Sequence, residues 1–192
     1  MTWADRVVAV YDANILYPAP LRDLLVRLAR AGLVAARWTD HIHDEWMRSV
    51  LKNRPDLSPA NLQRTRELME MAVPGALVEG YEAKIPGLHL PDPDDRHVLA
   101  AAIEAKADVI VTFNLGDFPA SVVSEHGVEV MHPDDFVMEL IARYPAGVVQ
   151  EARTHRAALR KPALSPDEYL ENLARIGLRS TAGWLRNRAE EI

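Results

Sequence analysis

PDPDDRHVLAAAIEAKADVIVTFNLGDF, residues 91–118, specifies an acidic helix start followed by a strand and a polar loop. Its first half places three aspartates ahead of an apolar run at helical spacing, which predicts acids in or just before the first turn of a helix: Asp92, Asp94 and Asp95. The helix macrodipole tolerates negative charge at that end. Its second half predicts a short aliphatic strand at residues 109–111 and, after it, a second group of oxygen ligands: Thr112, Asn114 and Asp117. Ligands bind at this edge of open parallel α/β sheets, so we expect a divalent-cation site.

The remaining apolar runs alternate between strand-like and helix-like patterns. Further strands are predicted at residues 7–11, 33–37, 76–79 and 128–131, and helices at residues 21–31 and 40–53, from residue 59, and from residue 136. Such alternation, with aliphatic strands, predicts an α/β fold: a three-layer α/β/α sandwich around a parallel sheet of about four to five strands. Right-handed crossovers would bring the carboxyl ends of the first strand and of strand 109–111 to one edge.

The first strand ends in Asp12-Ala13-Asn14. If this strand is parallel and adjacent to strand 109–111, Asp12 lies at the same edge as Asp117. Aspartate also caps helices, but Asp12 is too far from the predicted helix at residues 21–31 to cap it. We therefore interpret Asp12 as a functional acid.

Glu45 lies on the predicted helix at residues 40–53, which Thr39 can cap. It borders the apolar stripe of Ile42 and Trp46, whereas Asp44 points away from that stripe. Taken alone, Glu45 is explained by pairing with His41 four residues earlier. Its combination with the other acids makes it a candidate ligand.

Composition limits the possible functions. The chain has 192 residues, no cysteine and a net charge of −6, so disulfides, thiolate zinc sites and cysteine catalysis are excluded. The acid excess is concentrated in residues 71–142, which hold three Lys or Arg against thirteen Asp or Glu. An acidic centre between near-neutral or basic flanks is expected of a metal-dependent enzyme acting on a polyanion, although an ordinary acidic surface gives the same pattern.

The candidate ligands are hard oxygen donors. Carboxylates with Asn and Thr oxygens match Mg²⁺ or Mn²⁺ better than zinc. Such ions activate water and stabilise in-line displacement at a phosphodiester, so metal-assisted hydrolysis is the expected reaction class.

Four motifs in order resemble the PIN domain family. They are YDAN at residues 11–14, Glu45 on its helix, DPDD at residues 92–95 before an alanine-rich helix, and VTFNLGDF at residues 111–118. The resemblance covers roughly residues 6–141 and is greatest to the VapC-type toxin ribonucleases of type II toxin–antitoxin systems. It implies a Mg²⁺- or Mn²⁺-dependent endoribonuclease, an RNA substrate, inhibition by a cognate antitoxin, and frequent homodimers.

The resemblance also implies roles for individual residues. Four acids match the catalytic and metal-binding positions: Asp12, Glu45, Asp95 and Asp117. Five further residues match or adjoin the family's motifs and are expected to have supporting polar roles: Asn14, Thr112, Asn114, Asp92 and Asp94. Asp92-Pro93 can also form only the turn before the helix. Many relatives have an acid at position 114, and asparagine there keeps an oxygen ligand but removes a charge.

The chain is expected to divide into a PIN-like nuclease domain at residues 1–142 and a helical C-terminal appendage at residues 143–192. In the appendage, Ser165 and Glu168 form a capping-box pattern, and Gly177 is expected to stop that helix. Its arginines could contact RNA, although solvated helix faces explain most of them. Asp134 and Asp135 resemble the acidic motif but are explained as a helix start.

Three other functions compete with a toxin nuclease. A free-standing PIN nuclease in RNA processing and an inactive PIN-like module that binds RNA or protein both remain open. A haloacid-dehalogenase-like phosphatase would need an aspartate where Asn14 stands. The N-terminal sequence lacks a basic region followed by a long apolar stretch, and no run approaches a membrane span, so we expect a cytoplasmic protein without a membrane partner.

Overall fold

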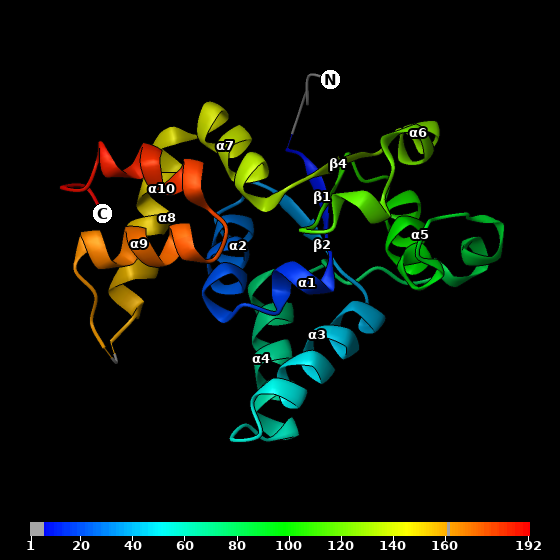
Figure 1. Ribbon diagram of the computed structural model, residues 1–192, viewed down its shortest axis with the longest axis horizontal. Helices are drawn as coiled ribbons and strands as arrows, with labels where there is room; N and C mark the ends of the chain where they lie inside the picture. The colour runs from blue at the N-terminus through cyan, green and yellow to red at the C-terminus, as the bar shows by residue number, and fades with distance from the viewer. Residues whose placement is uncertain (1–5, 161) are drawn as a thin grey trace.

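Four short strands form one parallel sheet at the centre of the computed structural model, which describes residues 6–160 and 162–192 (Figure 1). Residues 1–5, with which the expected nuclease domain begins, lie outside the described residues. The strands are β1 (Val8–Tyr11), β2 (Ala35–Arg37), β3 (Val109–Val111) and β4 (Glu129–Met131), in the order β2-β1-β3-β4. β1 and β3 are parallel, as the sequence predicted, and they are also adjacent, with Val10 opposite Ile110. Val10 and Ile110 are fully buried because helices cover both faces of a parallel sheet.

Ten helices surround this sheet among the described residues. They are α1 (Ala13–Leu16), α2 (Ala19–Arg30), α3 (Asp40–Asn53), α4 (Pro59–Ala72), α5 (Arg96–Glu104), α6 (Ala120–Val123), α7 (Pro133–Arg143), α8 (Pro145–Ala158), α9 (Pro166–Arg175) and α10 (Arg179–Arg186). Figure 1 shows α5 on one side of the sheet and α2 and α7 on the other. The predicted α/β class with helices on both faces is confirmed.

The prediction of a strand at residues 76–79 is wrong. Leu77 forms only a single parallel bridge with Trp38, just beyond the end of β2. Gly75 and Gly80, on either side, both have positive φ, so the chain turns before and after the bridge and no ladder can grow. The sheet therefore has four strands.

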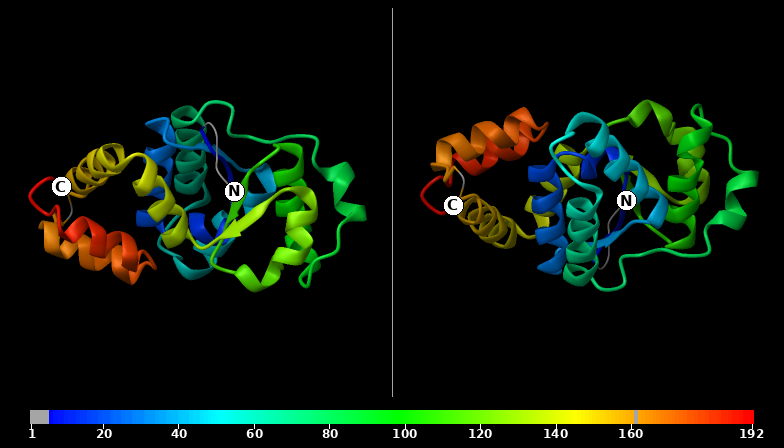
Figure 2. Two further views of the ribbon diagram at one scale, coloured as in Figure 1. Left: turned by 90° about the horizontal axis from the view of Figure 1, so that it is seen from above. Right: turned by 90° about the horizontal axis from the view of Figure 1, so that it is seen from below.

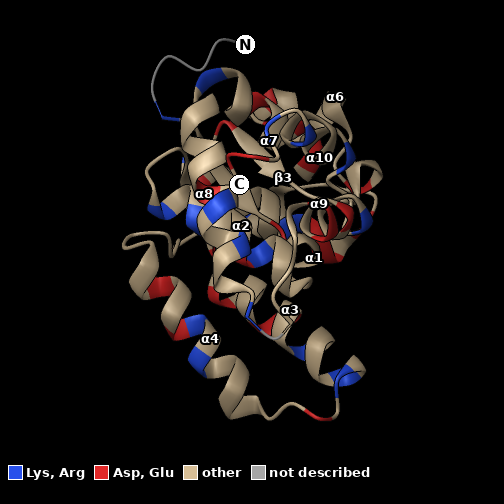
Figure 3. Cartoon of the chain, turned by 90° about the vertical axis from the view of Figure 1, so that its left-hand side faces the viewer, with Lys and Arg blue, Asp and Glu red and all other residues tan. Residues whose placement is uncertain are grey.

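Helices α3 and α4 lie side by side and extend away from the sheet (Figure 1). Thr39 caps α3 as predicted, its Oγ1 accepting from the Ile42 backbone N–H at 3.1 Å. Charges of both signs lie along α4 (Figure 3), and its Arg66 pairs with Asp40 of α3 at 2.5 Å. The fully buried Ile42 and Trp46 determine which face of α3 packs inward, and hence the side on which Glu45 lies.

The C-terminal helices form the end of the molecule farthest from α5 (Figure 2). The predicted capping box is present, because Glu168 accepts from the Ser165 backbone N–H at 2.8 Å and Ser165 caps α9 in return. Leu170 and Leu173 of α9 are fully buried and belong to the same hydrophobic core as the sheet. Gly177 follows α9 with a φ of +102°, as expected of a helix stop.

Asp134 has a different role from the helix start that the sequence predicted. It lies in the first turn of α7, but its carboxylate caps α10 instead, accepting from the backbone N–H groups of Ser180 at 2.7 Å and Thr181 at 2.9 Å, and from the Thr181 hydroxyl at 2.8 Å. Burial alone would raise the pKa of Asp134, but the hydrogen bonds from Thr181 and Ser180 outweigh burial and lower it. The cap of α7 is the His132 side chain, which accepts from the Asp134 backbone N–H. Asp134 therefore fastens α10 to α7.

Candidate active site

The carboxyl ends of β1 and β3 carry a hydrogen-bonded polar cluster. Asp12 is 5 % exposed, and its backbone N–H donates to the Val111 carbonyl at 3.1 Å, which continues the sheet pairing to the strand end. Its Oδ2 accepts from the Thr112 hydroxyl and from Asn14 Nδ2, both at 2.7 Å. These contacts hold the carboxylate in one orientation.

Asp12 also caps a helix that the sequence analysis did not predict. Its Oδ1 accepts from the Ala13 backbone N–H at 2.6 Å and begins the four-residue helix α1. Burial raises the pKa of Asp12, the hydrogen bonds from Thr112 and Ala13 lower it, and the nearby Glu45 carboxylate raises it; the net shift is upward. A buried acid whose charge is disfavoured in the isolated protein is expected of a cation ligand.

Thr112 and Asn14 link the two strand ends. The Thr112 hydroxyl accepts from Asn14 Nδ2 at 2.8 Å and from the Asn114 backbone N–H at 3.0 Å. Asn14 Oδ1 accepts from the Phe113 backbone N–H at 3.1 Å. The predicted supporting residues Asn14 and Thr112 thus position Asp12 and shape the loop after β3.

Three predicted acids meet in a single polar cavity of about 420 Å³. We call it the acid cavity; its lining residues are Asp12, Ala13, Asn14, Tyr17, Glu45, Arg48, Ser49, Asp95 and Asn114. Three other predicted residues do not line the acid cavity. Thr112 is fully buried, and Asp94 is exposed. Asp92 caps the 3-10 turn Pro93–Asp95 by accepting from the Asp94 backbone N–H. Asp92 therefore has the turn role considered from the sequence.

Asp95 shows how strongly negative charge is crowded at the acid cavity. Its pKa is raised to about 7, first by burial and then by the carboxylates of Asp12, Asp117 and Asp92, while His97 lowers it. Asp117 is thus close enough to act on Asp95, although it does not line the acid cavity. A divalent cation would relieve this repulsion, and the oxygen donors present suit Mg²⁺ or Mn²⁺.

Two histidines lie beside Glu45, and the sequence analysis missed one of them, His97, as a partner of the site. His97 is 3 % exposed, and its Nε2 lies 3.2 Å from Glu45 Oε2. His41 Nε2 lies 3.7 Å from Glu45 Oε1, which confirms the predicted pairing four residues apart. His97 follows Asp95 by two residues, so its position in the acidic helix could have identified it as a neighbour of the site from the sequence.

His41, Glu45 and His97 could be considered a metal site of their own, since their donor atoms lie within 4.8 Å of one another. However, the two imidazole rings are stacked, with centroids 3.9 Å apart and planes only 24° apart. An imidazole lone pair lies in its ring plane, so rings stacked in this way do not aim at one ion. We infer that the histidines orient Glu45 and that the carboxylates of the acid cavity fit the cation.

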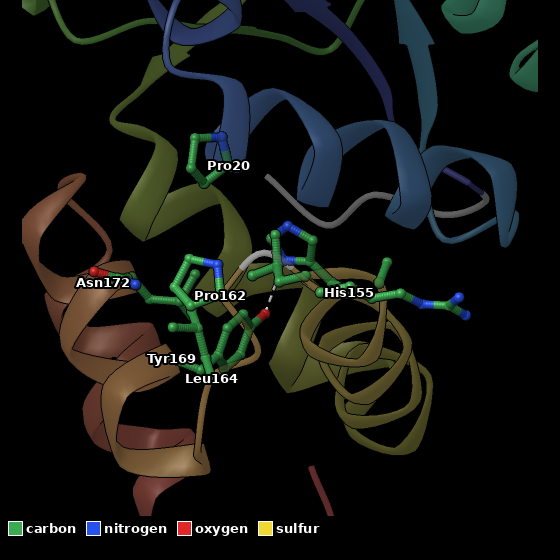
Figure 4. Close-up of a pocket in the computed structure, with 10 residues that line it drawn as sticks. Pro20, His155, Pro162, Leu164, Tyr169 and Asn172 are labelled. Carbon is green, nitrogen blue, oxygen red and sulfur yellow. Dashed lines mark hydrogen bonds between the residues drawn. The ribbon is translucent and has the colours of Figure 1, made fainter.

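An apolar cavity of about 510 Å³ lies between α2 and the C-terminal helices (Figure 4). It shares no lining residue with the acid cavity and has no carboxylate in its lining. Its main polar contact joins His155 Nδ1 and the Tyr169 hydroxyl at 3.0 Å. Of these two cavities, the acid cavity is the one whose lining contains the carboxylates that a divalent cation would need.

Residues 8–116, more than half of the chain, match the family model described as PIN domain. The chain belongs to the PIN domain family. The matched segment contains β1, β2, β3 and all nine residues that line the acid cavity. The family resemblance inferred from the sequence is confirmed.

Residues 133–187 match a second family model, the VapC50 C-terminal domain, which begins ten residues before the expected domain boundary. A 50-residue segment is 46% identical to "Putative ribonuclease VapC50" of Mycobacterium tuberculosis (strain ATCC 25618 / H37Rv). That segment covers 26% of this chain and 30% of the relative, so the match spans less than a third of the relative's length. No solved structure matches the chain significantly. No helix within residues 6–160 and 162–192 is both long and apolar enough to span a membrane.

Proposed function

We propose that this PIN-family chain is a metal-dependent endoribonuclease that hydrolyses RNA phosphodiester bonds at the acid cavity. The observation that carries the proposal is the convergence of Asp12, Glu45 and Asp95 from three separate elements on one cavity at the strand ends. Membership of the PIN family and the printed name of the M. tuberculosis relative support a ribonuclease.

The acids have distinct tasks in this proposal. Asp12, Glu45 and Asp95 would hold Mg²⁺ or Mn²⁺, with Asp117 adding negative charge from beside the cavity. When bound, the ion supplies charge neutralisation at the phosphate and activation of the attacking water. Thr112 and Asn14 keep Asp12 in place, and His97 does the same for Glu45.

Arg48 and Ser49 add a second function to the acid cavity. They follow Glu45 by three and four residues, so they lie on the same face of α3, and both line the cavity. A guanidinium beside the carboxylates can hold a phosphate oxygen of the substrate while the acids hold the cation. Spacing from Glu45 was the signal that would have identified them.

We also propose that the protein is the toxin of a type II toxin–antitoxin pair, acts in the cytoplasm, is inhibited by a cognate antitoxin and forms homodimers. The match to the VapC50 C-terminal domain supports this finer assignment. We retain the division into a nuclease domain at residues 1–142 and an appendage at residues 143–192 as part of the proposal.

Metal-dependent cleavage is the direct test. Pure protein with a mixed pool of single-stranded RNA should cleave in Mg²⁺ or Mn²⁺ and not in EDTA. Glu45→Gln should lose most of this cleavage because it removes one of three carboxylates from the acid cavity. Asp44→Asn is the matched control, since the Asp44 side chain on the same helix is 60 % exposed and does not line the cavity. RNA bound but cut by no form would contradict the enzyme and favour the binding module.

The raised pKa of Asp95 predicts how metal affinity depends on pH. Below about pH 7 the metal-free Asp95 carries a proton, which a cation must displace. We therefore expect Mn²⁺ affinity to rise with pH up to about 7, by at most roughly tenfold per pH unit, and to flatten above it. Calorimetric Mn²⁺ titrations across this range check the prediction. Asp95→Asn should remove most of the pH dependence, and an unchanged slope in that variant would contradict it.

A further inference from the structure

A second hollow, of about 600 Å³, lies where the loop after β3 meets the C-terminal helices. We call it the β3–α10 hollow; it is lined by Phe113, His132, Asp134, Arg175, Ile176, Gly177, Arg179 and Ser180. It adjoins the acid cavity through consecutive residues, since Phe113 lines the hollow and Asn114 lines the acid cavity. The loop after β3 therefore contributes to the lining of both the hollow and the acid cavity.

The aromatic part of the hollow is a fixed feature. The half-buried Phe113 ring packs edge-on against His132, with centroids 5.2 Å apart and planes at 66°. The Phe113 backbone N–H donates to Asn14 Oδ1 at 3.1 Å. A Cβ at position 177 would lie 2.8 Å from Phe113 Cε1, so only glycine lets the C-terminal helices approach the ring this closely. Phe113 is thus positioned by both the acid cavity and the appendage.

The side-chain charge that the hollow offers to a ligand is positive. Arg175 and Arg179 are both exposed, and within residues 6–160 and 162–192 no carboxylate lies within ion-pair distance of either. Asp134 is the one acid in the lining, and its two oxygens are occupied by the N-terminus of α10. Among the residues that the structure describes, Arg175 donates only to Asn172 Oδ1, at 2.9 Å, which leaves other guanidinium N–H groups for a ligand.

Guanidinium groups beside an aromatic ring are the combination that binds single-stranded nucleic acid, through phosphate pairing and base stacking. We propose that the β3–α10 hollow binds nucleotides of single-stranded RNA that flank the scissile bond, with Arg175 and Arg179 on phosphates and Phe113 stacked on a base. The proposal rests on the proposed function of the acid cavity. It makes the C-terminal helices part of the substrate surface.

The test measures RNA binding by the full chain as a function of salt. The probe is a fluorescein-labelled, unstructured RNA of about 16 nucleotides, and anisotropy is read in EDTA so that it stays intact. Each lost phosphate contact on a single strand lowers the slope of log affinity against log salt by about 0.7, so Arg175→Gln/Arg179→Gln should reduce the slope by about 1.4. Arg153→Gln/Arg186→Gln is the matched control, because both arginines are exposed and neither lines the hollow.

Phe113→Leu separates stacking from charge. It keeps an apolar side chain against Gly177 but removes the aromatic face, so affinity should fall about fivefold or more while the salt slope stays unchanged. Steady-state cleavage in Mg²⁺ should show a raised KM for both hollow variants with kcat largely retained.

The outcomes separate this proposal from the nuclease assignment. Wild-type cleavage with equal salt slopes and equal KM in wild type and the double arginine variant would overturn the hollow while leaving the nuclease intact, and would point to a protein partner there. A wild type that binds RNA but never cleaves it, together with a smaller salt slope in the double arginine variant, would support the hollow and contradict the nuclease. Wild type that neither binds nor cleaves RNA would overturn both.

Discussion

Asp12→Asn is expected to reduce metal-dependent RNA cleavage by roughly 10²–10³-fold, because a metal ion contributes several kcal/mol and each 1.36 kcal/mol is tenfold in rate. Asp12 is the best-fixed acid, with Ala13, Asn14 and Thr112 donating to its two oxygens. Asparagine has nearly the same shape but offers one oxygen, so it removes the charge and sets an amide against one of these donors. Single-turnover cleavage with saturating Mn²⁺ measures the effect.

Two further measurements secure this result. Circular dichroism and thermal unfolding of Asp12→Asn establish that lost activity is not lost fold. Thr112→Ser keeps the hydroxyl that donates to Asp12 at 2.7 Å, so it should retain most activity. Cleavage by Asp12→Asn at the wild-type rate would show that the acid cavity is not where RNA is cut.

Asp134→Ala should lower the free energy of unfolding by about 2–3 kcal/mol, the sum expected for a lost helix cap and for buried donors left without a partner. The buried carboxylate accepts three hydrogen bonds from Ser180 and Thr181, and alanine satisfies none of them. Urea unfolding followed by circular dichroism measures the change. Because the folded pKa of Asp134 is depressed, its contribution is present at neutral pH and is lost as the pH falls through that folded pKa.

Asp135→Ala is the matched control for this variant. Asp135 lies next to Asp134 in the first turn of α7 but is exposed, so only the interaction with the helix macrodipole is lost, about 0.3–1 kcal/mol. Equal destabilisation by the two variants would mean that Asp134 serves α7 rather than α10.

Local sequence signals sufficed for the elements that build the acid cavity. Apolar runs ending in Asp12 and Thr112 predicted two buried parallel strands, and the structure shows that the two are adjacent. Thr39 and the Ser165–Glu168 pair predicted helix starts because a cap depends only on residues within one turn. The convergence of Asp12, Glu45 and Asp95 was expected from their positions in the family motifs, and the structure places them in one cavity. Their catalytic roles stay predictions.

Features that depend on distant partners could not be predicted. His97 contacts Glu45 across 52 positions in sequence, and Asp134 caps a helix 46 and 47 positions later, so no local pattern shows either contact. The strand expected at residues 76–79 failed for a different reason: the chain turns at Gly75 and Gly80, so only Leu77 pairs with Trp38. The four-residue helix α1 is too short to produce a periodic signal.

The pairing of Asp12 with Thr112 joins residues that are 100 positions apart. At about 5–20 residues per second, a ribosome needs roughly 5–20 s to make the chain between them. Throughout that interval Asp12 has been made, but the strand whose end orients it has not. Because both strand ends build the acid cavity, the nuclease proposed here cannot cut RNA until more than half of the 192-residue chain has been made.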